Sequence, residues 1–188
     1  MLLRSWSIAA LILLISLPLQ AATTEVQGVS LPQRVELAGE PLQLNGAGLR
    51  QRLVFRVYVG SLYLPQRSSN IEQVLAMSGP KRIQLNLLRN VDQATLAEAI
   101  RDGFANNLSA IEQRRFANEI RQFAAMFDQG RQGDEVRIDF IPGTGVQVWH
   151  AGRDRGVIAG DEFHRAVLRI WLGEQPADER LKQGMLGR

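Results

Sequence analysis

The sequence predicts a single α+β domain in which an antiparallel β-sheet packs against a layer of α-helices. The chain reads as strands, then helices, then a hairpin, then helices, an order typical of α+β folds. Residues 53–64 are almost continuously apolar, as in a strand that is covered on both faces. Apolar residues at four-residue spacing through 96–127 indicate helices that pack on this sheet.

The first half of the domain is expected to be mostly strand. Residues 26–44 suit one or two short strands separated by glycine and proline turns, and the long strand 53–64 ends at Pro65. A short helix is expected at 71–77. Residues 83–89 then alternate between apolar and polar side chains, which predicts another strand.

Two helices are expected in the middle of the chain. Asn90 or Asp92 supplies the N-cap of the first, and Ser109 with Glu112 forms a capping box at the start of the second. The apolar stripe of the second helix is rich in phenylalanine, which is more typical of a core than of a cofactor site. It consists of Phe116, Ile120, Phe123 and Phe127.

The last third predicts a hairpin, a short strand and two helices. Residues 136–149 alternate around the glycine-rich turn 142–145, which no helix follows, so we do not interpret this turn as a phosphate-binding loop. A short strand is expected at 156–158. Asp161 is expected to cap a helix that ends near Gly173, and Pro176 to open the final helix.

Residues 1–21 have the layout of a secretory signal peptide, with one arginine, a short apolar run and small residues at the end. We therefore expect a mature domain of residues 22–188 in the periplasm, with no stable membrane span after cleavage. An uncleaved anchor helix is the alternative. A lipoprotein is excluded because the chain has no cysteine to acylate.

Composition excludes several functional classes. The 22 basic residues nearly balance the 19 acidic ones and the arginines are scattered, so the chain has no strong electrostatic footprint for nucleic acid. Without cysteine there is no thiol nucleophile or disulfide. The two histidines, His150 and His164, show no metal-ligand spacing, so neither a metal nor another cofactor is predicted.

Arg56 and Tyr58 interrupt the apolar strand. Side chains alternate along a strand, so both would lie on one face, and Arg50 would join them if the strand began near it. No acidic residue occurs in residues 41–71. Because a buried guanidinium is costly when unpaired, its partner must come from elsewhere in the fold or from a ligand.

Four separated blocks of sequence carry a resemblance to a known family. They are LNGAGLR with the strand ending SLYLP, then PKRIQLNLLR, then GDEVRIDFIPGTGV, and finally GVIAGDEFHRAVLRIWLG. In this order they resemble bacterial members of the chalcone isomerase-like family, and the chain is similar to an exported member over nearly its whole mature length. That family contains true isomerases, non-catalytic relatives and fatty-acid-binding proteins.

The resemblance to the true isomerases is partial at the catalytic positions. Their arginine matches Arg50, their strand threonine falls on Tyr58, and a polar residue of their last helix falls on His164. Their helix tyrosine falls near Ala94 or Thr95, and their helix asparagine near Arg101 or Asp102, with Asn106 and Asn107 a turn away. The resemblance therefore implies a catalytic set of Arg50 and Tyr58 only if the protein is an isomerase.

The sequence resembles the fatty-acid-binding branch of the family more closely at these positions. In that branch an arginine and a tyrosine at the positions of Arg50 and Tyr58 hold the carboxylate of a fatty acid. We therefore predict a non-catalytic periplasmic protein that binds a fatty acid or similar amphipathic carboxylate in an apolar cavity, through Arg50 and Tyr58, with Arg56 and His164 as further candidates. One alternative is an intramolecular lyase acting on an enone. Another is an envelope interaction protein with a closed cavity, favoured by bulk at Leu62 and Leu88. The sequence leaves the oligomeric state open.

Overall fold

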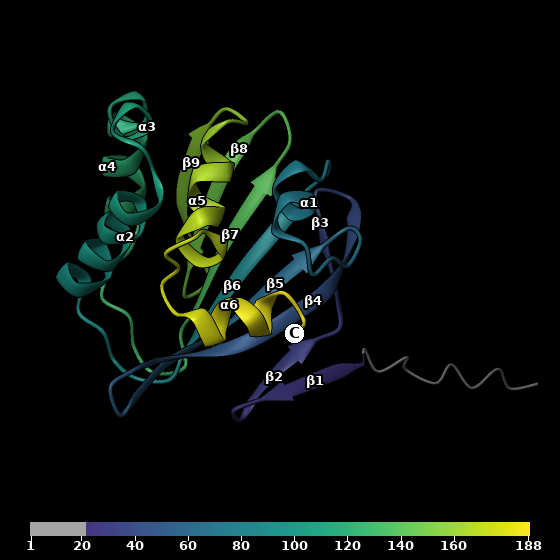
Figure 1. Cartoon of the computed structure of the whole chain (residues 1–188). Coiled ribbons are helices and arrows are strands. Elements are labelled where there is room, and N and C mark those ends of the chain that lie inside the picture. Colours follow the sequence, from purple (N-terminus) through teal and green to yellow (C-terminus); the bar gives the residue numbers. More distant parts are fainter. Residues whose placement is uncertain (1–21) are drawn as a thin grey trace, which may run out of the picture.

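Residues 22–188 are described by a computed structural model, and they form the predicted α+β fold (Figure 1). The predicted leader, 1–21, lies outside the described residues. Seven antiparallel strands pair in chain order into one sheet: β3 (Arg34–Leu37), β4 (Glu40–Arg52), β5 (Phe55–Leu64), β6 (Lys81–Leu87), β7 (Glu135–Ile141), β8 (Gly145–His150) and β9 (Arg153–Ala159). A separate hairpin, β1 (Thr23–Val26) and β2 (Val29–Pro32), precedes them.

Six helices are present in the described part of the chain: α1 (Ile71–Ala76), α2 (Gln93–Asn107), α3 (Ala110–Arg115), α4 (Ala117–Ala125), α5 (Phe163–Leu172) and α6 (Glu179–Met185). In Figure 1, α5 and α6 lie on one face of the sheet, and α2, α3 and α4 stand together beside α5. None of the helices in 22–188 is long and apolar enough to cross a membrane.

The two faces of the sheet bury separate apolar clusters. The larger cluster joins the helices to β5 through β9 and includes Tyr58, Leu62, Phe104, Phe123 and Trp171. The smaller cluster lies on the opposite face, where the β1–β2 hairpin helps to cover β4 and β5, and it includes Leu31, Val59 and Tyr63. The alternation predicted for the long strand is therefore confirmed from Tyr58 onward, with Tyr58 and Val59 on opposite faces.

The start of the long strand differs from the prediction. Leu53 and Val54 form a two-residue turn, so residues 46–52 belong to β4 and only Phe55 onward belongs to β5. This turn and Phe55 are exposed, whereas the sequence predicted burial on both faces. The apolar run misled the prediction because it continues through a turn that has no glycine or proline.

The glycine-rich segment before Arg50 belongs to strand β4, and helix α6 packs on it. A Cβ on Gly48 would lie 3.0 Å from Leu181 Cα, and one on Gly184 would lie 2.5 Å from the carbonyl oxygen of Ala47. The missing side chains therefore allow β4 and α6 to approach backbone to backbone. This close packing holds in place the part of β4 that carries Arg50.

The helix caps are predicted in part. Asp92 caps α2, and Ser109 with Glu112 forms the expected capping box, but the second helix divides at Phe116 into α3 and α4. Asp161 does not cap α5, because its carboxylate accepts the Gly143 N–H of the β7–β8 turn instead. The last helix begins at Glu179 rather than Pro176, because Asp178 accepts the N–H of Leu181.

Candidate functional site

Arg50 and Tyr58 are direct neighbours on adjacent strands. Arg50 lies near the end of β4, Tyr58 lies opposite it on β5, and the register shifts immediately after this pair. The guanidinium carbon of Arg50 lies 5.5 Å from the centroid of the Tyr58 ring. Arg50 is half-buried, and no carboxylate among residues 22–188 forms an ion pair with it. A partly desolvated cation thus lies beside a phenol.

The Tyr58 hydroxyl is fixed from behind by helix α5. The indole Nε1 of Trp171 donates to Tyr58 Oη at 2.9 Å, and both residues are buried. Burial raises the pKa of Tyr58, although the nearby charge of Arg50 acts in the opposite direction. The phenol therefore keeps its proton, and its O–H remains available as a donor.

An open pocket of about 300 Å³ extends outward from this pair, between the β4–β5 turn and the start of α2. Its wall is apolar at Leu53, Phe55, Val57, Val91 and Leu96. Arg50, Arg52 and Arg89 add three cations, and Asp92 is the one acidic side chain that lines it. Asp92 is already engaged, because it accepts the N–H and the hydroxyl of Thr95. The pocket therefore combines an apolar wall with uncompensated positive charge.

A second hollow, of about 290 Å³, adjoins the first and shares Arg50, Arg52, Thr95 and Ala99 with it. It is more polar, and Glu98, Asp102 and Asn106 contribute to its wall. Asn107 does not line it, because its amide donates to the carbonyls of Gly103 and Gln175. Of the positions expected to match the isomerase helix residues, Thr95, Asp102 and Asn106 thus face this hollow.

The interior behind Tyr58 is nearly full. A void of only about 30 Å³ remains there, enclosed by core residues of the sheet and helices such as Leu85, Ile100 and Phe127. Leu62 is completely buried in the core on the helix-covered face, whereas Leu88 packs on the opposite face, so only Leu62 adds bulk on the side of Tyr58. The available space for a ligand lies outside Tyr58, not deep within the fold.

The structure separates the other two predicted site residues from this pocket. Arg56 is exposed and Nη1 donates to Gln27 Oε1 at 3.3 Å, on the side of the β1–β2 hairpin. Arg56 is therefore not the buried cation that the sequence predicted, and it forms no ion pair within residues 22–188. His164 lies on α5, where its Nδ1 contacts the Asp161 carbonyl, and it lines a different hollow with Lys81 and Phe140.

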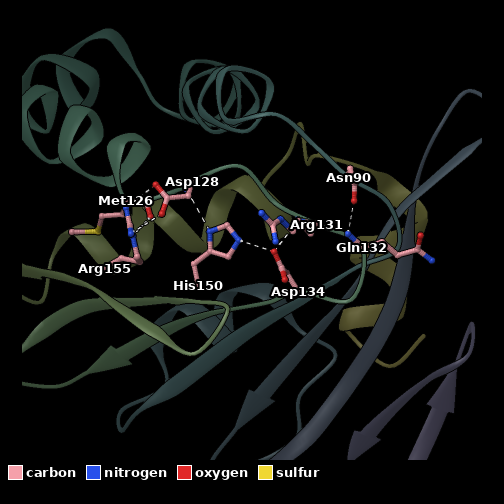
Figure 2. Close-up of polar contacts among 8 residues, drawn as sticks. All are labelled: Asn90, Met126, Asp128, Arg131, Gln132, Asp134, His150 and Arg155. Carbon is pink, nitrogen blue, oxygen red and sulfur yellow. Dashed lines mark hydrogen bonds and ion pairs between the residues drawn. The ribbon is translucent and has the colours of Figure 1, made fainter.

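His150 belongs to a second polar cluster, shown in Figure 2. Its Nδ1 accepts the Asp128 N–H at 3.4 Å, and its Nε2 lies 3.7 Å from Asp134 Oδ2. Arg155 pairs with Asp128 at 2.6 Å. Burial lowers the pKa of His150, which favours the neutral form of the ring. No group of three or more His, Asp or Glu side chains in 22–188 is arranged to hold a metal ion.

The comparison with known families decides the classification. The model of the family described as chalcone isomerase-like matches residues 22–187. The chain belongs to the chalcone isomerase-like family. No curated protein matches it in sequence. Among solved structures, the crystal structure of the Arabidopsis thaliana fatty-acid binding protein AtFAP1 is similar in fold, with a TM-score of 0.72 and 16% identity, over 88% of this chain and 96% of that one.

Within this chalcone isomerase-like fold, sequence reasoning missed several residues around Arg50. Trp171 was not among the predicted site residues, although a buried indole N–H needs an acceptor and the hydroxyl of a buried tyrosine can supply one. No sequence pattern around Arg52 or Arg89 marks either residue as part of a binding site. They meet at the pocket because the β4–β5 turn and the β6–α2 connection lie side by side, which only the tertiary structure shows.

Proposed function

We propose that this protein binds a small amphipathic carboxylate, such as a fatty acid, without transforming it. The observation that carries the proposal is the Arg50 guanidinium beside the Tyr58 phenol at an apolar pocket, with no carboxylate of the described chain paired to Arg50. A guanidinium offers a planar fork of donors, and the phenol adds one more, a set suited to a carboxylate. The fold shared with AtFAP1, a fatty-acid binding protein, supports it.

The volume of the pocket restricts the ligand. About 300 Å³ is at the lower end of the range for small-molecule sites, and the void behind Tyr58 adds only about 30 Å³. We therefore place the tail of the ligand along Leu53, Phe55, Val57 and Leu96, in the outer pocket. A medium-chain carboxylate fits this space better than a long chain buried in the core.

An isomerase of the chalcone type is the less favoured function. Such a reaction needs donors that stabilise the enolate as charge moves to the ketone oxygen. The helix tyrosine of the isomerases has no counterpart here, since Thr95 already donates its hydroxyl to Asp92. Purified protein should therefore not accelerate the cyclisation of a hydroxylated chalcone. Acceleration that is lost in Arg50→Ala would show that the protein is an enzyme.

We also propose that the protein works in the periplasm, from the signal-peptide pattern of residues 1–21. N-terminal sequencing of protein from the periplasmic fraction should begin at Ala22 or Thr23. Mass spectrometry of small molecules extracted from the same material tests the binding proposal. It should detect a carboxylate that is absent from an Arg50→Ala preparation, and equal recovery from both proteins would contradict it.

A further inference from the structure

The exposed apolar surface of this protein is concentrated at one point. Among residues 22–188 the exposed large apolar side chains are Leu53, Val54, Phe55, Ile111 and Val157. Three of these five are consecutive and form the tip of the β4–β5 hairpin, where Leu53 is 85% and Val54 82% exposed. In Figure 1 this hairpin end projects at the lower left, away from α5 and α6.

The tip also departs from the turn chemistry of the rest of the chain. The other two-residue hairpin turns are Gln27-Gly28, Ala38-Gly39 and Ala151-Gly152, and each uses glycine at a positive φ. In those turns the first residue also has a positive φ, between 49° and 54°, and a glycine follows it. The β4–β5 turn has Leu53 at a φ of 55°, a conformation that a leucine rarely adopts, and Val54 where the other turns have glycine. An asparagine or glycine would suit this position better. The turn therefore exposes two large apolar side chains to water, and it holds Leu53 in a backbone conformation that leucine disfavours.

The surroundings of the tip are basic. Arg52 and Arg56 flank it on the two strands, and Arg89 lies across from it with its guanidinium carbon 4.7 Å from the centroid of the Phe55 ring. All three arginines are exposed, and none is in an ion pair within residues 22–188. Asp92 is the acidic residue that the adjoining pocket contains.

We propose that the β4–β5 tip docks on an anionic lipid surface, with Leu53, Val54 and Phe55 inserted among the acyl chains and the three arginines at the phosphates. Apolar side chains beneath a basic rim are the pattern of segments that lie in the membrane interface. Arginine suits phosphate because its fork of donors matches two oxygens. A second copy of the chain fits less well, because a symmetric contact would bring the same arginines against one another.

Docking of the tip would also bring the ligand pocket to the membrane. Leu53, Phe55, Arg52 and Arg89 also line the pocket beside Arg50, so its mouth would open at the bilayer. An amphipathic ligand would then pass between bilayer and pocket without crossing water. This consequence rests on the proposed function, whereas the docking itself does not, and binding to vesicles is measured without any added ligand.

Co-sedimentation with vesicles tests the docking. Protein of residues 22–188 should bind vesicles of phosphatidylglycerol and phosphatidylcholine, and bind pure phosphatidylcholine at least about tenfold more weakly. Binding should weaken in about 0.5 M NaCl, where charges are screened within a few ångströms. Val54→Ser and the pair Arg52→Gln/Arg56→Gln should each lower binding by about tenfold. The matched controls, Ile111→Ser and Arg114→Gln on α3, should leave it unchanged.

Leu53→Asn separates docking from folding. Because asparagine tolerates a positive φ, this variant should unfold at a higher temperature than wild type while binding anionic vesicles more weakly. Equal binding by Leu53→Asn, Val54→Ser and wild type would overturn the proposal. So would light scattering that shows a dimer which Val54→Ser converts to monomer, because the tip would then be covered by a second copy.

Discussion

Trp171 donates a hydrogen bond to the hydroxyl of Tyr58 at 2.9 Å, and this contact joins the last long helix to the candidate binding strand. Since the indole occupies an acceptor position of the hydroxyl, the phenolic proton is left to point elsewhere. The pocket and Arg50 lie on its outer side. The bond therefore orients Tyr58 as a donor toward a ligand.

Tyr58→Phe should affect both folding and binding. It removes the acceptor of a buried indole N–H, so we expect a loss of about 1 to 3 kcal/mol in the free energy of unfolding. The affinity for a medium-chain fatty acid should fall by only about 1 kcal/mol, because one neutral donor is lost and the ring remains. Denaturant melts and calorimetry measure the two effects. In Tyr58→Phe/Trp171→Phe the stability losses should not add, since the second change removes the unsatisfied donor.

Gly184→Ala should loosen the packing of α6 on β4. The new methyl would lie 2.5 Å from the Ala47 carbonyl oxygen and 2.8 Å from Gly48 Cα, and backbone atoms cannot yield as side chains do. We expect a destabilisation of about 1 to 3 kcal/mol. Arg180→Ala, an exposed position on the same helix, should change stability by less than about 0.5 kcal/mol. Equal stability of the two variants in urea would show that the close backbone contact between α6 and β4 does not contribute to the stability of the fold.

Arg82 and Asp139 form a buried pair across β6 and β7, with two contacts of 2.6 and 2.8 Å. Asp139→Leu should cost about 3 to 5 kcal/mol, because it leaves a buried cation unpaired. Arg82→Met/Asp139→Leu should recover most of this loss, since no buried charge remains. Thermal melts of the two variants decide the matter. A double variant as unstable as Asp139→Leu would show that the loss of stability comes from the missing ion pair and not from the unpaired buried charge of Arg82.

His150 should make stability depend on pH. Burial lowers its pKa in the folded state from 6.5, although Asp134 and Asp128 oppose this and Arg155 reinforces it. The unfolded chain therefore binds a proton more readily, and the free energy of unfolding should fall as the pH drops below 6.5. His164 acts in the same direction, because burial lowers its pKa as well. Denaturant melts between about pH 7 and 5 should show a flatter dependence in His150→Asn/His164→Gln; an unchanged slope would exclude the histidines as the cause.

The sequence predicted the fold well because its signals are local or periodic. The capping box at Ser109 and Glu112 and the N-cap at Asp92 were confirmed, and the strand predicted at 83–89 is present as Lys81–Leu87. It failed where tertiary contacts decide. Asp161 binds a distant turn instead of capping its helix, and the turn at Leu53 has none of the residues by which turns are recognised.

Of the candidate binding site, the sequence predicted only Arg50 and Tyr58, and not the residues around them. Arg50 and Tyr58 were both singled out, but placing them on two paired strands required the unexpected turn between them. Arg56 was misplaced because strand alternation breaks at the register shift beside Arg50. Arg52 and Arg89 reach the pocket from segments far apart in sequence, and no local pattern signals that meeting.

Calorimetric titration of Arg50→Ala with a medium-chain fatty acid tests the central claim most directly. If the guanidinium holds the carboxylate, the affinity should fall by roughly 2 to 4 kcal/mol relative to wild type, as expected when one partner of a partly buried, charged hydrogen bond is removed. Arg101→Ala, an exposed position on α2 outside the pocket, should bind as wild type does. Arg50→Ala should remain folded, since no carboxylate of residues 22–188 is paired with it. Unchanged affinity in folded Arg50→Ala, or no binding by wild type, would contradict the account.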